Sequence, residues 1–167
     1  MGNSMMLEAE LVLELEVELG QTQEVGETPK GFLRLIPITG GTFSGPNIKG
    51  NILSGGYDWN TTRHDQTAHA FAKYALQTDD GVVISVENEG ILPSESELSQ
   101  TSQTNQTSQS VHSSMIKTTT RFEVADGKYE WLRSGVFVGS LEAGAGISGS
   151  ASATEKPSVC IKIYKLK

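Results

Sequence analysis

The chain has 167 residues, a formal net charge of −7 at pH 7 and a single cysteine. This length suffices for one domain with a sizeable core, so we expect residues 1–167 to form a single domain. The acidic balance argues against nucleic acid or an anionic membrane as partner, because both require a basic surface. The lone Cys160, the lack of a recognisable signal peptide and the absence of any apolar run near ~20 residues predict a cytoplasmic protein.

Residues 7–19 alternate strictly between apolar side chains and glutamates, with one interruption at Val12. Leucine and glutamate both favour helices. Apolar residues at every second position, however, would be spread around all sides of a helix, whereas they form one face of a strand. We therefore predict a long strand, with its glutamates facing solvent or protecting an exposed sheet edge.

Glycine and proline divide the rest of the chain into short segments. Residues 21–30 are predicted to form a polar turn, and Asp79-Asp80-Gly81 a hairpin turn. A single helical turn is expected over 128–134, with Asp126 as its N-cap. Further strands are predicted over 31–39, 47–54, 67–77, 82–89, 115–124, 136–141 and 158–166.

Two segments lack the apolar residues that a packed structure requires. Residues 93–114 are dominated by Ser, Gln and Thr, and are predicted to be a mobile surface insertion. The insertion is either an idle addition or a lid. Residues 142–157 form a second loop, rich in Gly, Ala and Ser.

These elements together predict an all-β protein with about eight to ten strands, one short helical turn and no long helix. The expected architecture is an antiparallel β-barrel, because closure removes the sheet edges. A barrel with about this number of strands has an interior wide enough for one small ligand.

Several ordered motifs also resemble one protein family. They are Pro37-Ile38-Thr39-Gly40-Gly41-Thr42-Phe43, Gly55-Gly56-x-Asp58-Trp59, Thr78-Asp79-Asp80-Gly81, Arg121-Phe122-Glu123 and Phe137-Val138-Gly139. In this order they are similar to those of the DUF3237 (UPF0311) family. The resemblance implies a barrel similar to that of allene oxide cyclase and dirigent proteins. The family name states no activity, but relatives of this barrel include cyclases.

Three polar residues are candidates for catalysis. Asp58 lies beside Trp59, and burial there would raise its pKa and make it a general acid or base; alternatively, it caps a turn. Arg121 either points into the barrel and binds an oxyanion, or pairs with Glu123 or Glu87 on the outside. Tyr74 shares its strand face with small alanines, where a phenol could donate a hydrogen bond to a ligand.

Five further residues are candidates for substrate binding: Trp59, His69, Asn88, Trp131 and Phe137. His69 lies on the strand face opposite to Tyr74, so it lines the lumen only if that face points inward. For the three aromatic residues, ordinary core packing is the alternative interpretation.

The sequence offers no motif for a metal or another cofactor. The histidines and the single cysteine lack metal-ligand spacing, and Gly40-Gly41 is not followed by a phosphate-binding element. We therefore expect no cofactor and no metal. The implied function is a cyclase or isomerase acting on a small hydrophobic, polyketide-like molecule of secondary metabolism.

Two other hypotheses remain at this stage: a non-catalytic binding or dirigent-like template barrel, and a structural oligomer with a filled interior. An interior pocket of roughly 300 Å³ or more with converging polar groups would exclude the filled barrel. A homodimer is expected as well, because residues 7–19 carry more apolar surface than a small barrel requires.

Overall fold

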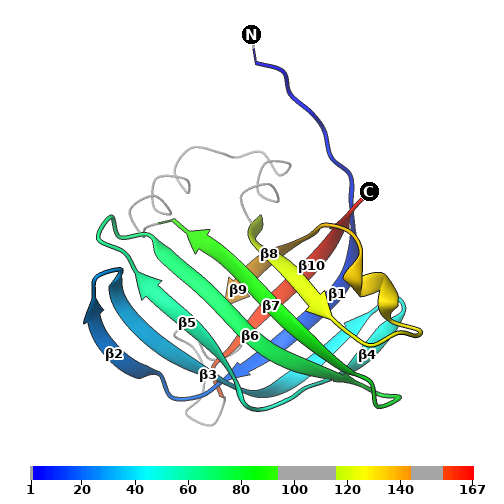
Figure 1. Ribbon diagram of the computed structural model, residues 1–167, viewed down its shortest axis with the longest axis horizontal. Helices are drawn as coiled ribbons and strands as arrows, with labels where there is room; N and C mark the ends of the chain where they lie inside the picture. The colour runs from blue at the N-terminus through cyan, green and yellow to red at the C-terminus, as the bar shows by residue number, and fades with distance from the viewer. Residues whose placement is uncertain (1, 94–115, 144–155) are drawn as a thin grey trace.

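A computed structural model describes residues 2–93, 116–143 and 156–167 (Figure 1). Ten strands and one 3₁₀ turn form the described fold. They are β1 (Ala9–Leu19), β2 (Gln23–Thr28), β3 (Gly31–Gly45), β4 (Ile48–Ile52), β5 (Gly56–Thr62), β6 (Ala68–Thr78), β7 (Val83–Leu92), β8 (Ile116–Glu123), η2 (Glu130–Arg133), β9 (Phe137–Ala143) and β10 (Ser158–Leu166).

The strands close into an antiparallel barrel. The sheet runs β1-β10-β9-β8-β7-β6-β4-β3, and pairing between β1 and β3 completes the ring. Short β4 and β5 share one position between β3 and β6: β4 pairs with the C-terminal half of β3 and β5 with its N-terminal half. The ring therefore has eight positions, and the predicted all-β barrel is confirmed.

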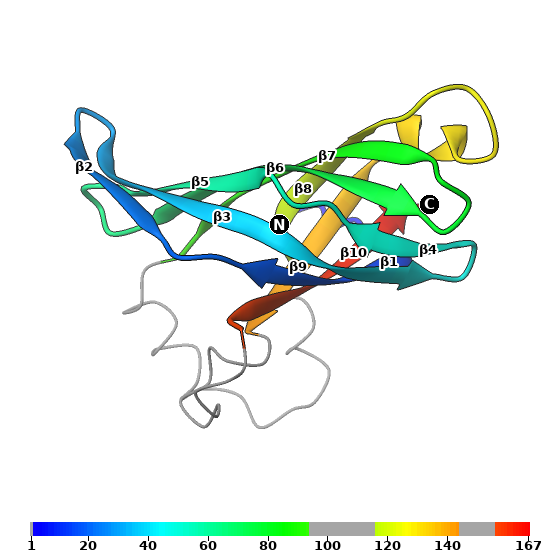
Figure 2. The same cartoon turned by 90° about the horizontal axis from the view of Figure 1, so that it is seen from below.

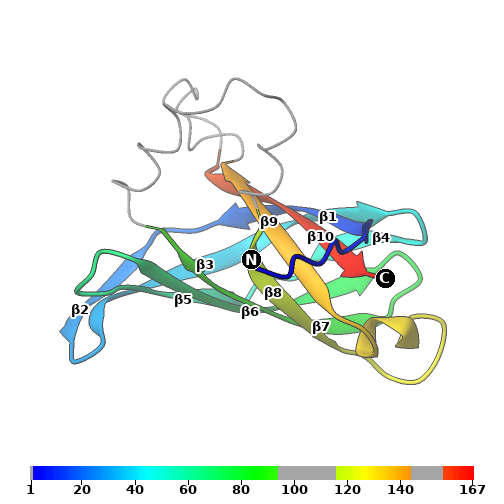
Figure 3. The ribbon, with the colours of Figure 1, turned by 90° about the horizontal axis from the view of Figure 1, so that it is seen from above.

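The sheet continues beyond the ring on one side. Among the strands that the structure describes, β2 pairs only with the N-terminal half of β3, which in turn pairs with β5. Figures 2 and 3 show β2, β3 and β5 reaching past the region occupied by β9 and β10. We predicted a polar turn over 21–30, and this is wrong for 23–28, because backbone pairing with β3 forms a strand there without an apolar pattern.

The predicted strand at the N-terminus is confirmed over Ala9–Leu19. Its residues Leu13, Leu15 and Val17 are fully buried inside the barrel. Strand β1 pairs with β10 on one side and β3 on the other, so its glutamates do not protect an exposed edge. The apolar face of β1 is used within the barrel, and it no longer argues for a dimer.

Closure between β1 and β3 depends on Gly41. This residue has a φ of +128°, and a Cβ atom placed on it would lie 2.0 Å from the carbonyl oxygen of Glu16. A side chain at this position would push β1 away from β3. The glycine thus allows the close approach that completes the ring.

The hydrophobic core fills one end of the barrel. Its buried side chains include Leu13, Leu76, Ile84, Val86, Phe122 and Ile163. The 3₁₀ turn packs there through Leu132. Asp126 does not cap this turn: Tyr129 is the N-cap residue without a side-chain bond, and Asp126 instead accepts a 2.7 Å hydrogen bond from Arg133.

The predictions for the insertion at 93–114 and for the loop at 142–157 fall largely on residues 94–115 and 144–155, which lie outside the described residues. Within the described part of the chain, no helix is long and apolar enough to cross a membrane.

Candidate functional site

The end of the barrel opposite the core contains a cavity of about 310 Å³. Side chains from every position of the ring line it. The aliphatic part of the lining is Val17, Leu19, Ile36, Ile38, Val159 and Ile161. The polar part includes Asp58, Asn60, Tyr74, Asn88 and Thr118. This size and these converging polar groups exclude the hypothesis of a filled barrel.

Small side chains on β6 leave the space for this cavity. Ala70, Ala72 and Tyr74 share one face of the strand and line the cavity, and toward the core Leu76 follows on the same face. Gly56 on β5 allows β5 and β6 to approach each other beside this face, because a Cβ atom there would lie 2.5 Å from the Cβ of Tyr74. The interior therefore changes from open to filled along β6, as the inner residues change from alanine to leucine.

Asp58 is one of two carboxylates that line this cavity; the other is Glu142 on β9. Asp58 lies within β5, opposite Ile36 on β3 and Ala72 on β6, and not in a turn. Its Oδ1 accepts a 3.0 Å hydrogen bond from the backbone N–H of Phe71. Burial raises the pKa of Asp58 above its ordinary value, although hydrogen bonds from Asn60 and Phe71 and the charge of His69 oppose the increase. A carboxyl group with a raised pKa is suited to donate and accept protons.

Two buried hydroxyl groups also line the cavity. Among the described residues, neither Tyr74 Oη nor Thr118 Oγ1 has a hydrogen-bond partner. Burial raises the pKa of the Tyr74 phenol, so this group stays protonated and can act as a donor. A buried hydroxyl without a partner is costly, and a polar group of a ligand would satisfy it.

Asn88 is buried on β7 next to these hydroxyls. Its Oδ1 accepts a 2.8 Å hydrogen bond from Thr120 Oγ1 on β8. The positions of Asp58, Tyr74 and Asn88 together agree with the expectation that polar residues on several strands converge in the lumen.

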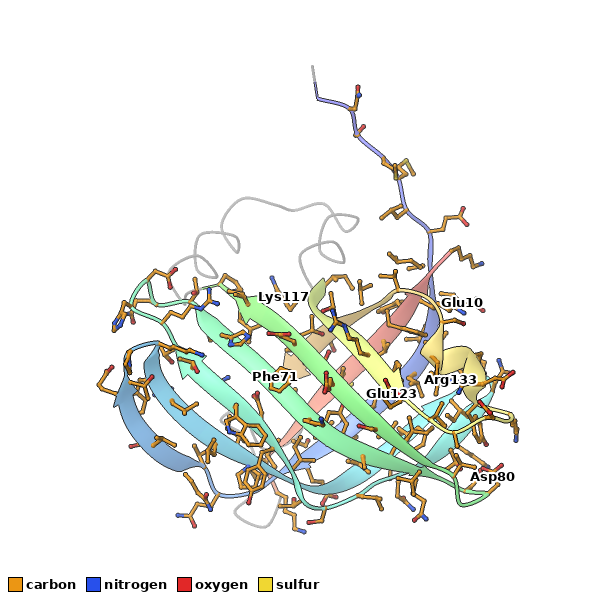
Figure 4. All side chains as sticks on the ribbon, viewed as in Figure 1. Glu10, Phe71, Asp80, Lys117, Glu123 and Arg133 are labelled. Atoms are coloured by element: carbon orange, nitrogen blue, oxygen red, sulfur yellow. The ribbon has the colours of Figure 1, made fainter. Side chains whose placement is uncertain are left out.

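Three predicted residues lie on the outer face instead. Arg121 is exposed, because Thr120 and Phe122 on either side of it point inward. His69 contacts Glu89 at 2.7 Å beside a surface hollow, and Trp59 is 41% exposed and packs against Tyr57. For Arg121 and His69 the structure therefore agrees with the alternative of an outer-face position, and the expectation that Trp59 lines the lumen is wrong. Figure 4 labels Phe71 on β6 and Glu123 on β8, which belong to the same outer face.

Trp131 and Phe137 lie away from the cavity. Trp131 borders a hollow at the opposite end of β1, near Leu11 and Lys165. Phe137 is buried in the core, where its ring contacts that of Phe122 edge to face at 5.1 Å. For both residues the alternative interpretation, packing, agrees with the structure.

Asn60 and Thr118 line the cavity but were not predicted as site residues from the sequence. Asn60 is two residues from Asp58 and therefore on the same face of β5. Thr118 shares its face with Thr120 and Phe122 on β8. Alternation along each strand is the signal that could have found both residues, once one inward-facing neighbour was known.

A metal centre has no support in the described residues, where no three His, Cys, Asp or Glu side chains are grouped to hold an ion.

The comparisons with known proteins agree with this architecture. Residues 7–166 match the family model described as "Protein of unknown function (DUF3237)". The chain belongs to the DUF3237 family. A UPF0311 protein of Rhodopseudomonas palustris (strain TIE-1) is 36% identical over 136 residues, which cover 80% of this chain and 87% of that protein.

Solved structures share the fold of this DUF3237 chain. The crystal structure of the conserved protein of unknown function RPA1785 from R. palustris has a TM-score of 0.76 and 30% sequence identity, and covers 98% of this chain and 100% of its own. The crystal structure of an enzyme from Penicillium herquei has a TM-score of 0.67 at 18% identity, with 100% of both chains covered. This second likeness concerns the fold alone.

Proposed function

We propose that this barrel is a cofactor-free cyclase or isomerase of a small hydrophobic molecule. The observation that carries the proposal is the combination of Asp58, a partly buried carboxyl group with a raised pKa, with two buried hydroxyls in one cavity lined mainly by aliphatic side chains.

Asp58 would move the proton in the proposed reaction. Its carboxylate removes a proton from a carbon or hydroxyl of the bound molecule, and the resulting acid returns a proton after the new bond has formed. Tyr74 and Thr118 donate hydrogen bonds to the oxygen on which negative charge develops. The aliphatic walls exclude water and hold a flexible substrate in a folded conformation. A polyketide-like molecule of secondary metabolism has the required carbonyl groups and flexibility.

A non-catalytic binding or template barrel is the alternative. It is favoured by the backbone hydrogen bond from Phe71 to Asp58, because this bond gives the carboxyl group a structural role as well. Both functions require the same occupant in the cavity. They differ in whether Asp58 exchanges a proton with it.

Proton exchange with a hydrophobic ketone tests the proposal without knowledge of the natural substrate. The protein is incubated with 2-tetralone in D₂O, and deuterium incorporation beside the carbonyl is followed by NMR. Asp58→Asn keeps the side-chain volume and removes the titratable group, so we expect the rate of exchange to fall by about 10²–10⁴. The control, Asp79→Asn, changes an exposed carboxylate that pairs with Lys49, and should exchange at the parent rate.

The outcomes separate the two functions. Binding of 2-tetralone without faster exchange in the parent protein would support the binding barrel and refute the enzyme. No binding of the ketone or of any other apolar ligand would refute both functions.

The proposal includes a homodimer in the cytoplasm. The dimer rests on the general prevalence of two-fold assemblies, and the exposed Trp59 with its neighbour Tyr57 is an apolar surface that a second copy could cover. The cytoplasmic location rests on the single Cys160.

A further inference from the structure

Arg34 is a cationic residue on the inner face of the sheet, just outside the cavity. On β3 it lies two residues from Ile36, which lines the cavity. It pairs in register with Asn60 on β5, which also lines the cavity. Because residues opposite each other in antiparallel strands point to the same face, Arg34 faces the cavity side of the sheet.

Neighbouring side chains hold the guanidinium group in place. Its Nη1 donates a 3.0 Å hydrogen bond to Thr62 Oγ1, and its central carbon lies 4.7 Å from the centre of the Phe32 ring. Phe32 and Thr62 lie opposite each other on the same inner face, two residues further from the core than Arg34 and Asn60. Stacking on an aromatic ring orients the guanidinium plane and leaves its remaining donors available.

No ion pair neutralises Arg34 in the described part of the chain, whereas Arg133 contacts both Asp126 and Glu130. Glu24 lies opposite Arg34 on β2, but it is exposed and forms no ion pair with it. Arg34 is therefore a partly buried, oriented cation whose donors are not taken up by a carboxylate of the protein.

We infer that Arg34 binds an anionic group of the ligand, most suitably a carboxylate, at the mouth of the cavity. This inference rests on the proposed function and narrows its substrate class to hydrophobic acids. A guanidinium group matches a carboxylate because its two parallel N–H donors meet two oxygens.

The position of Arg34 also sets the shape of such a ligand. Arg34 lies opposite Asn60, and Asn60 is two residues from Asp58 on β5. Measured along the strands, Arg34 is therefore roughly 7 Å from the level of Asp58. The substrate class is then an acid whose carboxylate is separated by a few bonds from the atom that exchanges a proton. Its apolar part occupies the space beside Ala70 and Ala72.

A matched pair of probes tests the assignment: 4-phenylbutanoate and the neutral 4-phenylbutanamide, measured by isothermal titration calorimetry. We expect the parent protein to bind the acid about ten- to a hundred-fold more tightly than the amide, as a charged hydrogen-bonded pair allows. Arg34→Gln should abolish this preference and leave the affinity for the amide within about two-fold.

Two control variants separate a specific contact from a general charge effect. Arg121→Gln makes the same change of charge on the outer face, and should keep the preference for the acid. Thr62→Val removes the hydroxyl that accepts from Arg34 but keeps the guanidinium, and should keep most of the preference. If Arg34→Gln fails to fold, Arg34→Lys replaces it, with an expected partial preference.

Equal binding of the acid and the amide by the parent protein would overturn the role of Arg34 and leave the proposed function intact. Loss of the preference in Arg121→Gln as well as in Arg34→Gln would also overturn it. Failure of both probes to bind would count against the cavity as a binding site, and hence against the proposed function itself.

Discussion

Substitution of Tyr74 by phenylalanine separates a ligand-binding hydroxyl from a structural one. Tyr74 is buried, and its Oη has no hydrogen-bond partner among the described residues. An unsatisfied buried polar group costs about 1–3 kcal/mol. Tyr74→Phe removes only this oxygen and keeps the buried ring, so the ligand-free variant should be more stable than the parent by up to about that amount.

The expected change is large enough to measure by thermal unfolding. For a chain of this length, 1 kcal/mol corresponds to roughly 2–4 °C in Tm. The full cost of the unsatisfied hydroxyl would therefore raise the Tm of the variant by about 2–12 °C. Affinity for a carbonyl ligand such as 2-tetralone should fall by about two- to twelve-fold, because one hydrogen bond is lost. The variant is thus expected to become more stable and to bind more weakly.

Tyr129 provides the matched control. It is equally buried, but its hydroxyl donates a 2.7 Å hydrogen bond to Asp80. Tyr129→Phe should therefore lower Tm and leave ligand affinity unchanged. The reasoning would be refuted if Tyr74→Phe were as destabilising as Tyr129→Phe, because the Tyr74 hydroxyl would then support the fold.

Three other predictions concern pH, the insertion and assembly. Because the pKa of Asp58 is raised in the folded state, the folded protein binds more protons than the unfolded chain above pH 3.8, and stability should fall as pH rises through the raised pKa. Urea unfolding from about pH 4 to about pH 8 should show that Asp58→Asn flattens this decrease; an unchanged slope would contradict it. Deletion of residues 93–114, which contain too few apolar residues for a core, should leave Tm within a few degrees, and a collapse of stability would show that they pack. Light scattering at micromolar concentration should give a dimer mass, and a monomer mass would end that proposal.

The barrel and the inward direction of Tyr74 could be predicted because they follow from local alternation, whereas for Asp58 the sequence left a lumen position and a turn both open. Along β6, alanines and Tyr74 share one face, and a face with small residues and one phenol suggests a lumen. The position of Arg121 was left open although the same signal existed: Phe122 and Val124 are apolar and flank Glu123, so the opposite face of β8 had to carry Arg121 outward.

Other features had no local signal. Strand β2 has no apolar alternation, and only its pairing with β3 makes it a strand. In the run Leu33-Arg34-Leu35-Ile36, apolar residues occur on both faces, so alternation cannot assign the direction of Arg34. Leu35 lies on the outer face opposite Trp59, where the sheet extends past the ring and both residues remain partly exposed. The register of three strands decides the orientation of Arg34, and a single segment of sequence does not contain that information.

Two short strands, β4 and β5, occupy one position of the barrel ring, and each forms a separate part of the barrel wall. Strand β4 borders the core and β5 borders the cavity, and the chain passes from one to the other through Leu53–Gly55. Residues 56–62 carry Asp58 and Asn60 but none of the fully buried core side chains. Substitutions at the inward-facing positions of this segment should therefore change the cavity lining without replacing a fully buried core side chain.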